Sequence, residues 1–498
     1  YCELPLGDDL PALVAAVAAA GLRAKVRTGG VTADAIPPAE GVLALLRACR
    51  AHGVPCKATA GLHHVLGGRH PLTEAADADT AEMYGFAPLF LTAALLDTPA
   101  GHQGDTARQL VLCLGEALRH ADRGGRLRLL HRHRVRALET QGGRVCGAIA
   151  VDESSGAERR LKADAVVLAM GGLNGSHEAC RAHWPEDRPQ PATMLNGAHP
   201  YADGRLHAEV AARLGGRIVN PGEMWNYAGG IAHPFPHFEG HGLSIVPCKS
   251  ALWLDHRGER IGPEPLVTGF DTHWLCQRVA EQAKPWTWQL LNRRIALKEF
   301  AISGAEHNPR IRDRQFVRFL IDTLFGNAPL VKQMQRESAD FLVDDSLPGL
   351  AAKMNALTCS HDIDAERLHA TVAAFDAHFD AGRNPADDAQ VRRIEQARQW
   401  RPDRLRTCAP APLSKAGAGP WIAIRLQLIT RKSLGGLRTD LHSRVLGRDE
   451  APINGLYCVG EAAGFGGGGA NGKRSLEGTF LPGCILTARA AARHLTKG

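Results

Sequence analysis

Residues 455–483 read GLYCVGEAAGFGGGGANGKRSLEGTFLPG, and this stretch decides the fold. The apolar run at residues 453–459 predicts a short buried strand, which ends at Gly460 and Glu461. The loop that follows has five glycines in the six positions 464–469, and a helix is predicted after it. Glycines let a backbone approach a flat ligand closely, whereas a packed element has no need of so many. The order of strand, acid, loop and helix therefore predicts a ligand site, and a flexible glycine linker is the weaker alternative.

The same stretch carries two groups that suit a ligand of this kind. Glu461 stands just past the strand end, where a carboxylate accepts hydrogen bonds from a ribose hydroxyl. The amides of residues 479–483 open the predicted helix of residues 481–495, so they would face the ligand with a partial positive charge. The sequence thus predicts an acid and a helix N-terminus on either side of the glycine-rich loop.

This segment resembles the C-terminal flavin-binding segment of the fumarate reductase/succinate dehydrogenase flavoprotein superfamily. It is most similar to the branch of FAD-binding dehydrogenases, which are relatives of the 3-ketosteroid Δ1-dehydrogenases. The resemblance implies FAD as the cofactor and implies that Glu461 holds its ribitol or ribose. It also implies that the amides at the start of the helix hold the pyrimidine oxygen of the flavin. The cofactor contacts expected in this segment are Gly460, Glu461, Gly478, Thr479 and Leu481.

A second cofactor segment is expected at residues 163–175. A predicted buried strand at residues 163–169 runs into Met170-Gly171-Gly172, which is either a plain turn or a cofactor contact. It resembles the superfamily's A-T-G-G-type turn, which packs under the FAD diphosphate and adenosine. The resemblance therefore favours cofactor contact at Gly171 and Gly172, and it implies that the backbone of Val135 pairs with adenine.

A third segment, TRKSLGGLRTD at residues 430–440, resembles the H-T-x-G-G-L segment of the superfamily. The resemblance implies that Gly435 and Gly436 press on the flavin. Lys432 and Ser433 replace the expected His and Thr, and this replacement argues against a fumarate reductase proper. A cation such as Lys432 near flavin N1 would stabilise the negative charge of the reduced ring.

The first 97 residues alternate short predicted helices and strands, which suggests a parallel α/β fragment. The first 100 residues contain no strand–GxGxxG–helix pattern, although FAD proteins of the two-dinucleotide-fold type normally begin with one. The segments AKVRTGG and KATAGLHH instead resemble a separate bacterial family of unknown function. We therefore expect a chimera, by natural fusion or by misjoining, in which a foreign α/β fragment of uncertain role replaces the usual N-terminal FAD half-site. A small-molecule activity of its own is a third possibility for this fragment.

The segment Ala202-Asp203-Gly204 resembles the one that precedes the substrate domain of the superfamily, and this resemblance implies that residues 205–412 form that inserted domain, often called the capping domain. It holds six of the eight tryptophans, which suits a domain that forms a pocket. Tyr227 and His233 are acid/base candidates in it, because phenol and imidazole groups can exchange a proton with carbon. Prolines 234 and 236 exclude a continuous helix around His233, so this part is predicted to be a loop. A packed aromatic loop without catalytic function is the alternative.

Two further motifs in the capping domain point to polar sites. SALWLDHRGERI at residues 250–261 resembles a substrate-domain hairpin of fumarate reductases, in which Arg260 and Glu264 fall on catalytic positions. The next arginine expected there is replaced by Val267, and Arg474 lies one position away from where the superfamily places a substrate-binding arginine. EFAISGAEHNPRIRDR at residues 299–314 concentrates polar and cationic side chains and is either an anion site or a solvated turn.

Composition sets the limits of these expectations. A net charge of +7 over 498 residues, with 44% hydrophobic and 22% charged residues, is typical of a globular protein and gives no reason to expect nucleic acid. The twelve cysteines lack CxxC, haem or zinc spacing, which favours reduced thiols in the cytoplasm and no metal site. No apolar run reaches about 18 residues, so no membrane span is expected, and no signal peptide is visible.

Together these patterns predict an α/β protein with a Rossmann-like FAD-binding domain whose dinucleotide motif is missing. The expected domains are the N-terminal fragment at 1–97, the FAD-binding domain at 98–204 and 413–498, and the α+β capping domain at 205–412. The expected function is an FAD-dependent dehydrogenase or reductase that transfers hydride between flavin N5 and a CH–CH or C=C small-molecule substrate. The alternative is a chimeric or degenerate non-catalytic chain with an incomplete FAD site.

Overall fold

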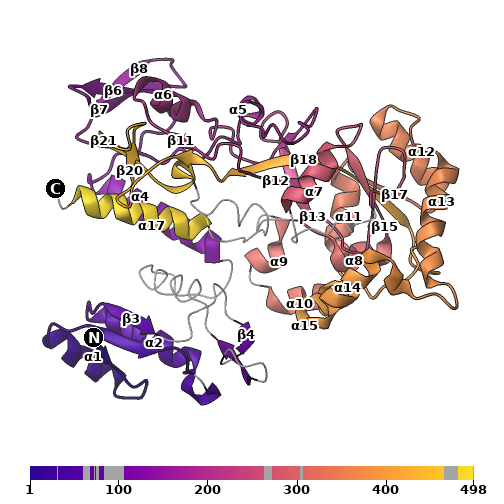
Figure 1. Cartoon of the computed structure of the whole chain (residues 1–498), viewed down its shortest axis with the longest axis horizontal. Coiled ribbons are helices and arrows are strands. Elements are labelled where there is room, and N and C mark those ends of the chain that lie inside the picture. Colours follow the sequence, from indigo (N-terminus) through magenta and orange to yellow (C-terminus); the bar gives the residue numbers. More distant parts are fainter. Residues whose placement is uncertain are drawn as a thin grey trace. The chain divides into compact units, whose positions relative to one another are not determined.

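The computed structural model of the chain describes residues 1–30, 32–59, 68–71, 73, 78–83, 106–262, 272–302, 307–313, 315–464 and 480–496 (Figure 1). The chain divides into two compact units, Tyr1–Leu129 and Leu130–Gly498. The expected domain boundary near residue 97 lies outside the described residues.

The first unit is a small α/β fold. Parallel strands β1 (Cys2–Glu3), β2 (Ala24–Arg27) and β3 (Cys56–Thr59) form one sheet, as the alternation of helices and strands predicts. Leu10, Val14 and Val17 share one face of a helix and are buried against the sheet. The other elements are the helices α1 (Leu10–Ala19), η1 (Ala33–Ala35), α2 (Ala39–Ala51) and α4 (Thr106–Arg123), and the antiparallel pair β4 (Gly68–Pro71) and β5 (Thr80–Met83).

The second unit begins with the part that we call the cofactor half, which comprises residues 130–214 and 434–496. Its central sheet has the order β20-β21-β9, and β9 (Val166–Leu168) runs parallel to β21 (Pro452–Cys458). The two apolar runs that were expected as strands before the glycine turns therefore lie side by side in one sheet, a pairing that the sequence did not predict. The helix predicted at the end of the chain is α17 (Phe480–Leu495).

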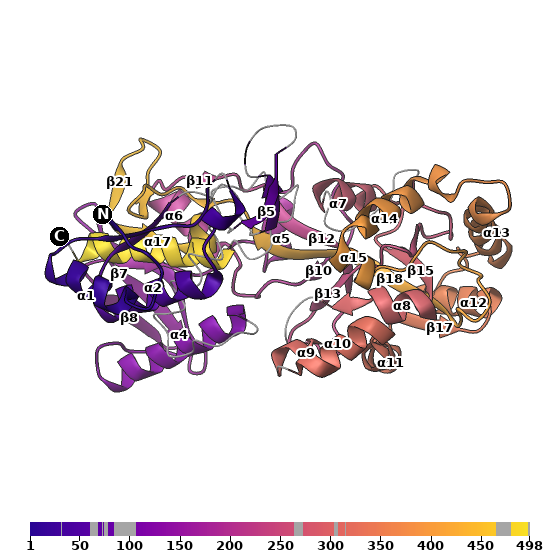
Figure 2. The ribbon, with the colours of Figure 1, turned by 90° about the horizontal axis from the view of Figure 1, so that it is seen from below.

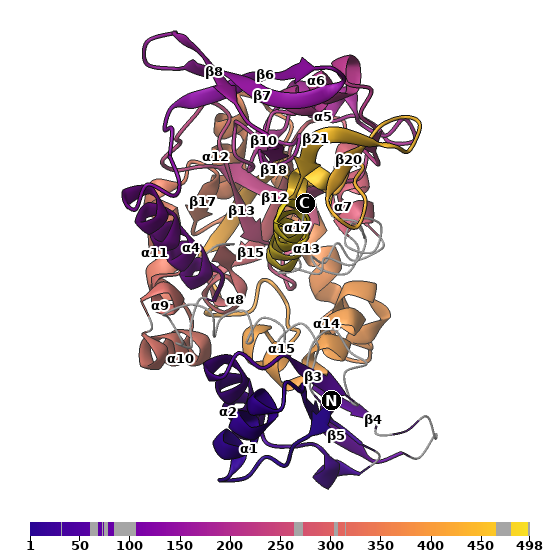
Figure 3. The same cartoon turned by 90° about the vertical axis from the view of Figure 1, so that its left-hand side faces the viewer.

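An antiparallel three-stranded sheet, β6-β7-β8, adjoins the central sheet and packs against α6 (Arg205–Arg213), as Figure 3 shows. Within the central sheet, β9 is the outermost strand among the described residues, and the side chain of Val167 is 42% exposed. The prediction that this strand is buried is therefore wrong at Val167, because its side chain points from a face of the sheet into the open cavity along β9. The remaining elements here are β6 (His133–Gln141), β7 (Arg144–Asp152), β8 (Glu158–Lys162), α5 (His177–Ala182), β19 (Gly436–Leu437), β20 (Arg444–Leu446) and η5 (Gly460–Ala463).

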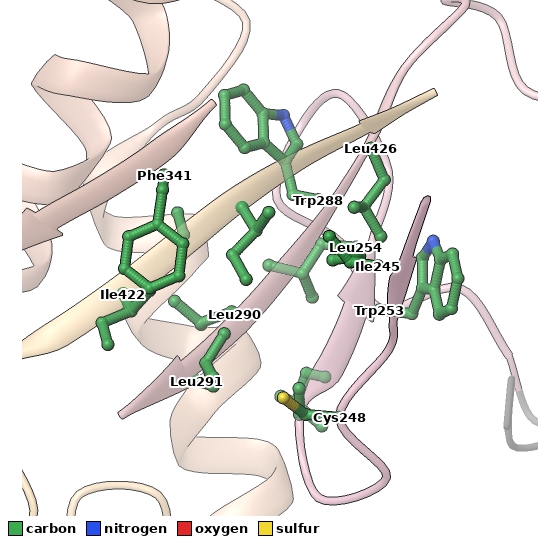
Figure 4. Close-up of a cluster of buried hydrophobic side chains, with 14 of the residues drawn as sticks. Ile245, Cys248, Trp253, Leu254, Trp288, Leu290, Leu291, Phe341, Ile422 and Leu426 are labelled. Carbon is green, nitrogen blue, oxygen red and sulfur yellow. The ribbon is translucent and has the colours of Figure 1, made fainter. Parts of the chain in front are cut away.

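The rest of the second unit, residues 215–433, is the part that we call the cap. It is built on an eight-stranded sheet around β18 (Trp421–Ser433), which pairs with β12 (Met224–Ala232), β15 (Thr287–Asn292), β17 (Phe341–Asp344) and β10 (Leu195–Asn196). Every residue of β15 is buried, because helices cover the sheet. Trp288, Leu290, Phe341, Ile422 and Leu426 gather in this core (Figure 4).

The remaining strands of the cap are β11 (Ile218–Val219), β13 (Gly242–Val246), β14 (Leu252–Leu254) and β16 (Ala301–Ile302). Its helices are α7 (Thr272–Ala280), α8 (Arg293–Glu299), α9 (Pro309–Arg312), α10 (Phe316–Phe325), α11 (Ala328–Glu337), α12 (Leu347–Thr358), α13 (Ala365–Asp376), η3 (Ala377–Phe379), η4 (Pro385–Asp387), α14 (Ala389–Gln399) and α15 (Arg401–Arg406).

The strand β18 links the cap to the cofactor half. Its N-terminal part lies in the core of the cap, and its C-terminal end at Ser433 reaches the turn that follows β9. Figure 1 shows β18 and β12 running together along the second unit. The segment expected to press on the flavin is therefore the continuation of the longest strand of the cap.

Two further observations concern the whole described chain. None of the helices among the described residues combines the length and apolar character needed to cross a bilayer. All twelve cysteines are free.

Candidate cofactor and substrate site

The site is built where β9 and β21 end side by side. Val459 donates its backbone N–H to the carbonyl of Leu168 at 3.0 Å, which carries the parallel pairing to the ends of both strands. Each strand then turns at a glycine with positive φ, Gly171 at 78° and Gly460 at 64°. Side chains other than glycine rarely adopt this conformation, so both turns need glycine. The two segments that were expected to hold the cofactor therefore leave the sheet next to one another.

We call the place where the turns at Gly172 and Glu461 meet Ser433 the junction. Glu461 is its central charged group. Its Oε1 accepts a hydrogen bond from the backbone N–H of Ser433 at 2.8 Å. Burial raises the pKa of the Glu461 carboxyl above its ordinary value, while the Ser433 N–H and the positive charge of Lys432 act in the opposite direction. A largely buried carboxylate with one hydrogen-bond donor retains acceptor capacity, which suits a role toward ligand hydroxyls.

Gly172, in the turn after β9, packs closely against the other two segments of the junction. A Cβ on Gly172 would meet the Oγ of Ser433 and would come within 2.6 Å of the Oε1 of Glu461. Gly435 and Gly436 are equally confined, since a Cβ on Gly435 would collide with the carbonyl of Asn220 and one on Gly436 with the backbone of Gly464. In the described part of the chain these glycines are required by close packing of protein segments.

Asn174 was not singled out from the sequence, yet it joins the three segments. It is 1% exposed, and its Nδ2 donates to the carbonyl of Lys432 at 3.1 Å. The hydroxyl of Ser433 accepts from the backbone N–H of Leu173 at 2.7 Å and donates to the Oδ1 of Asn174 at 3.1 Å. Thr430 donates its Oγ1 to the Asn174 carbonyl at 2.8 Å. The only signal in the sequence was the position of Asn174 directly after Gly-Gly-Leu.

His207 is a second residue that sequence reasoning missed. It lies on α6, is 1% exposed, and its Nε2 is 3.0 Å from the carbonyl of Ala462. Burial lowers the pKa of this imidazole, so the neutral ring is favoured as a hydrogen-bond donor. His207 therefore holds the turn Gly460–Ala463 that carries Glu461.

A cavity of about 510 Å³ lies along β9, beside the residues that lead into the turn at Gly171. Val135, Val166, Leu168 and Met170 form its apolar walls, and Gly171 follows directly after them. The volume is in the range of small-molecule and cofactor sites.

The rim of this cavity is cationic and aromatic. Arg134 lies 4.5 Å from the ring centre of Tyr201 and 3.4 Å from a carboxylate oxygen of Glu153, and Arg205 lies 3.3 Å from Asp203. Apolar walls suit an adenine ring, and guanidinium groups suit a diphosphate. The residues present therefore fit the adenosine diphosphate side of FAD.

The candidate catalytic residues on β12 and β18 lie beside the junction. Trp225 pairs with Lys432 across the two strands, and the Lys432 Nζ is 5.8 Å from the centre of the Trp225 ring. The guanidinium of Arg431 lies 5.4 Å from the centre of the Tyr227 ring, and the Tyr227 and Trp225 rings are 6.2 Å apart. Tyr227 and Lys432 thus belong to one cluster next to Ser433 and Glu461.

His233 follows the end of β12 in a loop, as predicted, and is 9% exposed. Its ring stacks on that of His241 at 4.2 Å and lies 5.6 Å from that of His307. His241 is bridged to Asn196, whose Oδ1 accepts from Thr430 at 3.3 Å. The imidazole cluster is therefore connected to the junction through Asn196 and Thr430. No group of three or more metal-ligating side chains in the described ranges is arranged to hold a metal ion.

Arg260 is placed in a different environment. Its guanidinium forms a bidentate contact with Asp388 at 2.6 and 3.2 Å and also donates to Gln390 at 2.9 Å. Burial acts to raise the pKa of Asp388, but the hydrogen bonds and charge of Arg260 outweigh it, and this pKa lies below its ordinary value. These contacts hold α14 against the hairpin after β14, which is a structural arrangement.

The other expected site residues divide into two groups. Leu481 lies in the first turn of α17. Glu264, Arg474, Gly478 and Thr479 lie outside the described residues.

Comparison with known proteins identifies the family. A family model described as FAD binding domain matches residues 91–481. A protein of Mycobacterium tuberculosis named KsdD-like steroid dehydrogenase is 40% identical over 383 residues, which cover 74% of this chain and 67% of that protein.

Two solved structures are also similar. The open conformation of a flavocytochrome c3 fumarate reductase matches 98% of this chain and 76% of that chain, with a TM-score of 0.53 and 15% identity, which shows the fold alone. The 3-ketosteroid Δ1-dehydrogenase from Sterolibacterium denitrificans matches with a TM-score of 0.49 and 19% identity, over 76% of this chain and 62% of that chain. The chain therefore belongs to the family of FAD-binding domains, and it is an FAD-dependent oxidoreductase related to the KsdD-like steroid dehydrogenases.

Proposed function

We propose that this chain is a dehydrogenase that removes two hydrogens from neighbouring carbons of a steroid-like ring ketone. The relative that is 40% identical over 383 residues is named a steroid dehydrogenase, which supports this substrate class. Lys432 and Ser433, which replace the expected His and Thr of fumarate reductases, argue against a dicarboxylate substrate.

The observation that carries the proposal is the junction of Gly172, Ser433 and Glu461. Three segments that lie far apart in the sequence meet there with hydrogen bonds of 2.7 and 2.8 Å. At this junction an acidic side chain, a glycine backbone in close contact and the end of a cap strand lie together. This is the combination that a flavin between a nucleotide-binding half and a substrate cap requires.

The residues that would hold the cofactor lie on two sides of the junction. Val135 and Gly171 would contact the adenosine and diphosphate side, and Glu461 would accept hydrogen bonds from the sugar or ribitol hydroxyls. When bound, FAD supplies a flavin N5 that accepts hydride from a substrate carbon. The cofactor contacts proposed around the flavin ring are Gly172, Gly435, Gly436, Gly460, Gly478, Thr479 and Leu481.

Proton transfer is assigned to the residues on the cap side. Loss of hydride from one carbon must be balanced by removal of a proton from its neighbour, which requires a base. Tyr227 and His233 are the proposed acceptors, and Arg431 over the Tyr227 ring stabilises negative charge on that side chain. Lys432 places positive charge beside Glu461 and would offer it to a bound flavin. Glu264 and Arg474 remain proposals on the basis of their motif positions, and the contacts of Arg260 support a structural role.

The rival proposal is that the chain is non-catalytic because its FAD site is incomplete. Within the described ranges β9 is an outermost strand with the exposed side chain of Val167, so that edge of the cofactor sheet is uncovered. A Rossmann sheet normally continues at such a position with the strand that precedes the glycine motif.

Purified protein of this sequence decides between the two. We expect purified protein to bind FAD with a visible flavin band and to reduce an electron-accepting dye when 4-androstene-3,17-dione is added. Tyr227→Phe should lower kcat by about 10²–10⁴-fold with the flavin still bound, whereas Tyr457→Phe, whose hydroxyl contacts His494 away from the junction, should not. Protein that binds no FAD supports the rival, and bound FAD without dye reduction contradicts the proposed substrate.

The division into domains at 1–97, 98–204, 205–412 and 413–498 is part of the proposal, although α6 packs on the cofactor half and β18 lies in the sheet of the cap. It is supported by the family match, which starts at residue 91. The twelve free cysteines support a reducing compartment, so we propose a cytoplasmic protein.

A further inference from the structure

The outward face of helix α10 is apolar. Five of its ten residues are large apolar side chains with exposed fractions of 49–80%, and we call them the apolar stripe: Val317, Leu320, Ile321, Leu324 and Phe325. Their spacing along the sequence places them on one face of the helix. Single exposed apolar residues are common on protein surfaces, whereas a continuous apolar stripe marks a surface that binds another molecule.

The opposite face of α10 holds the helix against the cap. Phe319, Asp322 and Thr323 line a cavity of about 300 Å³ that α8, α9 and α11 also line. Asp322 pairs with Arg310 of α9 at 3.0 Å, and Figure 2 shows α9, α10 and α11 side by side. Because α10 is attached through this face, the apolar stripe points away from the cap. This is the reverse of a helix that packs its apolar face on a core.

Helix α15 adjoins α10 and adds two exposed apolar side chains. Leu405 lies on α15 and Trp400 directly precedes this helix, and their exposed fractions are 42% and 66%. Tryptophan is enriched where proteins meet the headgroup region of a bilayer, because its ring is apolar and its N–H is polar. The composition of this surface therefore suits a boundary between water and an apolar phase.

The charges on the same elements leave an excess of positive charge. The carboxylates in residues 309–325 and 400–406 are all paired with cations: Asp313 with Arg312, Asp322 with Arg310 and Asp403 with Lys249. Four exposed cations in these ranges form no ion pair with a residue that the structure describes: Arg318, Arg401, Arg404 and Arg406. Helices α10 and α15 therefore carry four positive charges that no carboxylate of the described chain balances.

We propose that α10 and α15 dock the protein on the surface of an anionic membrane. The apolar stripe would lie at the boundary of headgroups and acyl chains, and the arginines would contact lipid phosphates. Helices with an apolar face and basic flanks lie in the plane of a bilayer surface without crossing it. Each cation near an anionic leaflet strengthens such binding. Two copies of this basic surface would repel one another, so charge favours a membrane over a second copy of the chain.

The proposed substrate class agrees with this docking. A steroid-like ring ketone is largely apolar and would be concentrated in the same membrane. This agreement rests on the proposed function, whereas the apolar stripe and the four arginines do not.

Sedimentation with lipid vesicles tests the inference on purified protein of this sequence, without substrate. We expect the protein to bind vesicles of phosphatidylcholine and phosphatidylglycerol more tightly than vesicles of phosphatidylcholine alone. Val317→Gln/Phe325→Gln should lower the affinity for the mixed vesicles about 10–100-fold, because two side chains that enter the bilayer are lost. The matched control is Leu441→Gln/Leu486→Gln, two exposed apolar residues of the cofactor half, and it should bind as the wild type does.

The contribution of charge is tested by a second pair of variants. Arg401→Gln/Arg404→Gln should lower the affinity for the mixed vesicles about 10–30-fold and should leave the weaker binding to phosphatidylcholine nearly unchanged. The control Lys415→Gln/Arg448→Gln removes two exposed cations outside α10 and α15, and it should keep the affinity of the wild type.

Wild-type protein that binds neither kind of vesicle would overturn the inference, as would equal losses in the stripe variant and its control. Sedimentation velocity without lipid examines the other occupant. A dimer that Val317→Gln/Phe325→Gln abolishes would assign the apolar stripe to a second copy of the chain and would also overturn membrane docking. Because no substrate is present, failure of the proposed dehydrogenase reaction leaves each of these results unchanged.

Discussion

The sheet of the cap and the sheet of the cofactor half differ in how completely they are paired and covered. In the cap, β18 has neighbouring strands along both edges, and the whole of β15 is buried. In the cofactor half, the described central sheet has only the strands β20, β21 and β9, and Val167 of β9 is 42% exposed. Among the described residues, the sheet of the cap is therefore the more completely paired and buried of the two.

This difference indicates where the stability of the second unit resides. The main buried cluster lies almost entirely in the cap, while a smaller cluster lies under the cofactor sheet. A ligand that binds only the folded chain adds stability in proportion to the logarithm of its concentration over Kd. We therefore expect FAD to stabilise the cofactor half much more than the cap.

The largest effect is expected from the core of the cap. Trp288 is fully buried, so Trp288→Ala should lower the free energy of unfolding by about 3–5 kcal/mol, as for other large-to-small core changes. Its Nε1 has no hydrogen-bond partner among the described residues, so Trp288→Phe should cost clearly less. Denaturant unfolding measures both, with the exposed Trp400→Ala as the control. A small effect of Trp288→Ala would show that the cap is not the stable part.

A smaller effect is expected from the buried ion pair of the cap. Asp388→Ala should cost about 2–4 kcal/mol, because it leaves Arg260 without its partner and removes the N-cap of α14. Since the pKa of Asp388 is lowered in the fold, its contribution is present above the ordinary aspartate pKa and is lost as pH falls toward the folded value. The difference in unfolding free energy between wild type and Asp388→Ala should therefore shrink as pH falls from neutral to acid. The control Asp387→Ala, on exposed η4, should follow the wild type over the same range.

The third effect concerns the cofactor half, where the substitution should raise the free energy of unfolding instead of lowering it. The pKa of Glu461 is raised by burial, so its ionisation destabilises the FAD-free fold as pH rises above the ordinary glutamate value. Glu461→Gln should therefore raise the stability of FAD-free protein at neutral pH, by an amount on the order of 1 kcal/mol, and should weaken FAD binding. Thermal unfolding with and without FAD measures both changes. A variant that lost stability in both conditions would contradict the assigned environment.

The smallest effect is expected at the uncovered edge. Val167→Thr should change the stability of FAD-free protein by less than about 0.5 kcal/mol, because the side chain already contacts solvent. Leu168→Ala, at the next and buried position of the same strand, should cost about 2–4 kcal/mol. Equal effects at the two positions would show that the side chain of Val167 is covered in solution.

The fold elements with strong apolar patterns could be predicted from the sequence. The runs of β9 and β21 were recognised as strands that end in glycine turns, whereas their parallel pairing was found only in the structure. The exposure of Val167 could not be predicted, because burial of a strand side chain depends on the elements that pack over its face of the sheet, and an apolar run does not identify them.

The site was predictable where a residue acts through its position in a motif and not where it acts through long-range contacts. Glu461 and Gly172 were identified in this way, and the structure places them together. Asn174 and His207 were missed, because each acts through hydrogen bonds to residues more than 250 positions away. The partner of Arg260 is 128 positions distant, so its motif could not reveal the ion pair with Asp388.

The most direct measurement of the central claim is a spectrophotometric titration of the full-length chain with FAD, run on wild type and on Gly172→Val. If the turn after β9 and the Glu461 turn form one flavin site, the wild type should bind one equivalent with a perturbed visible flavin band. Gly172→Val, whose side chain would collide with Ser433 and Glu461, should lose that binding at unchanged circular dichroism. Wild-type protein that leaves the flavin spectrum unchanged, or a folded Gly172→Val variant that binds FAD as the wild type does, would contradict the account.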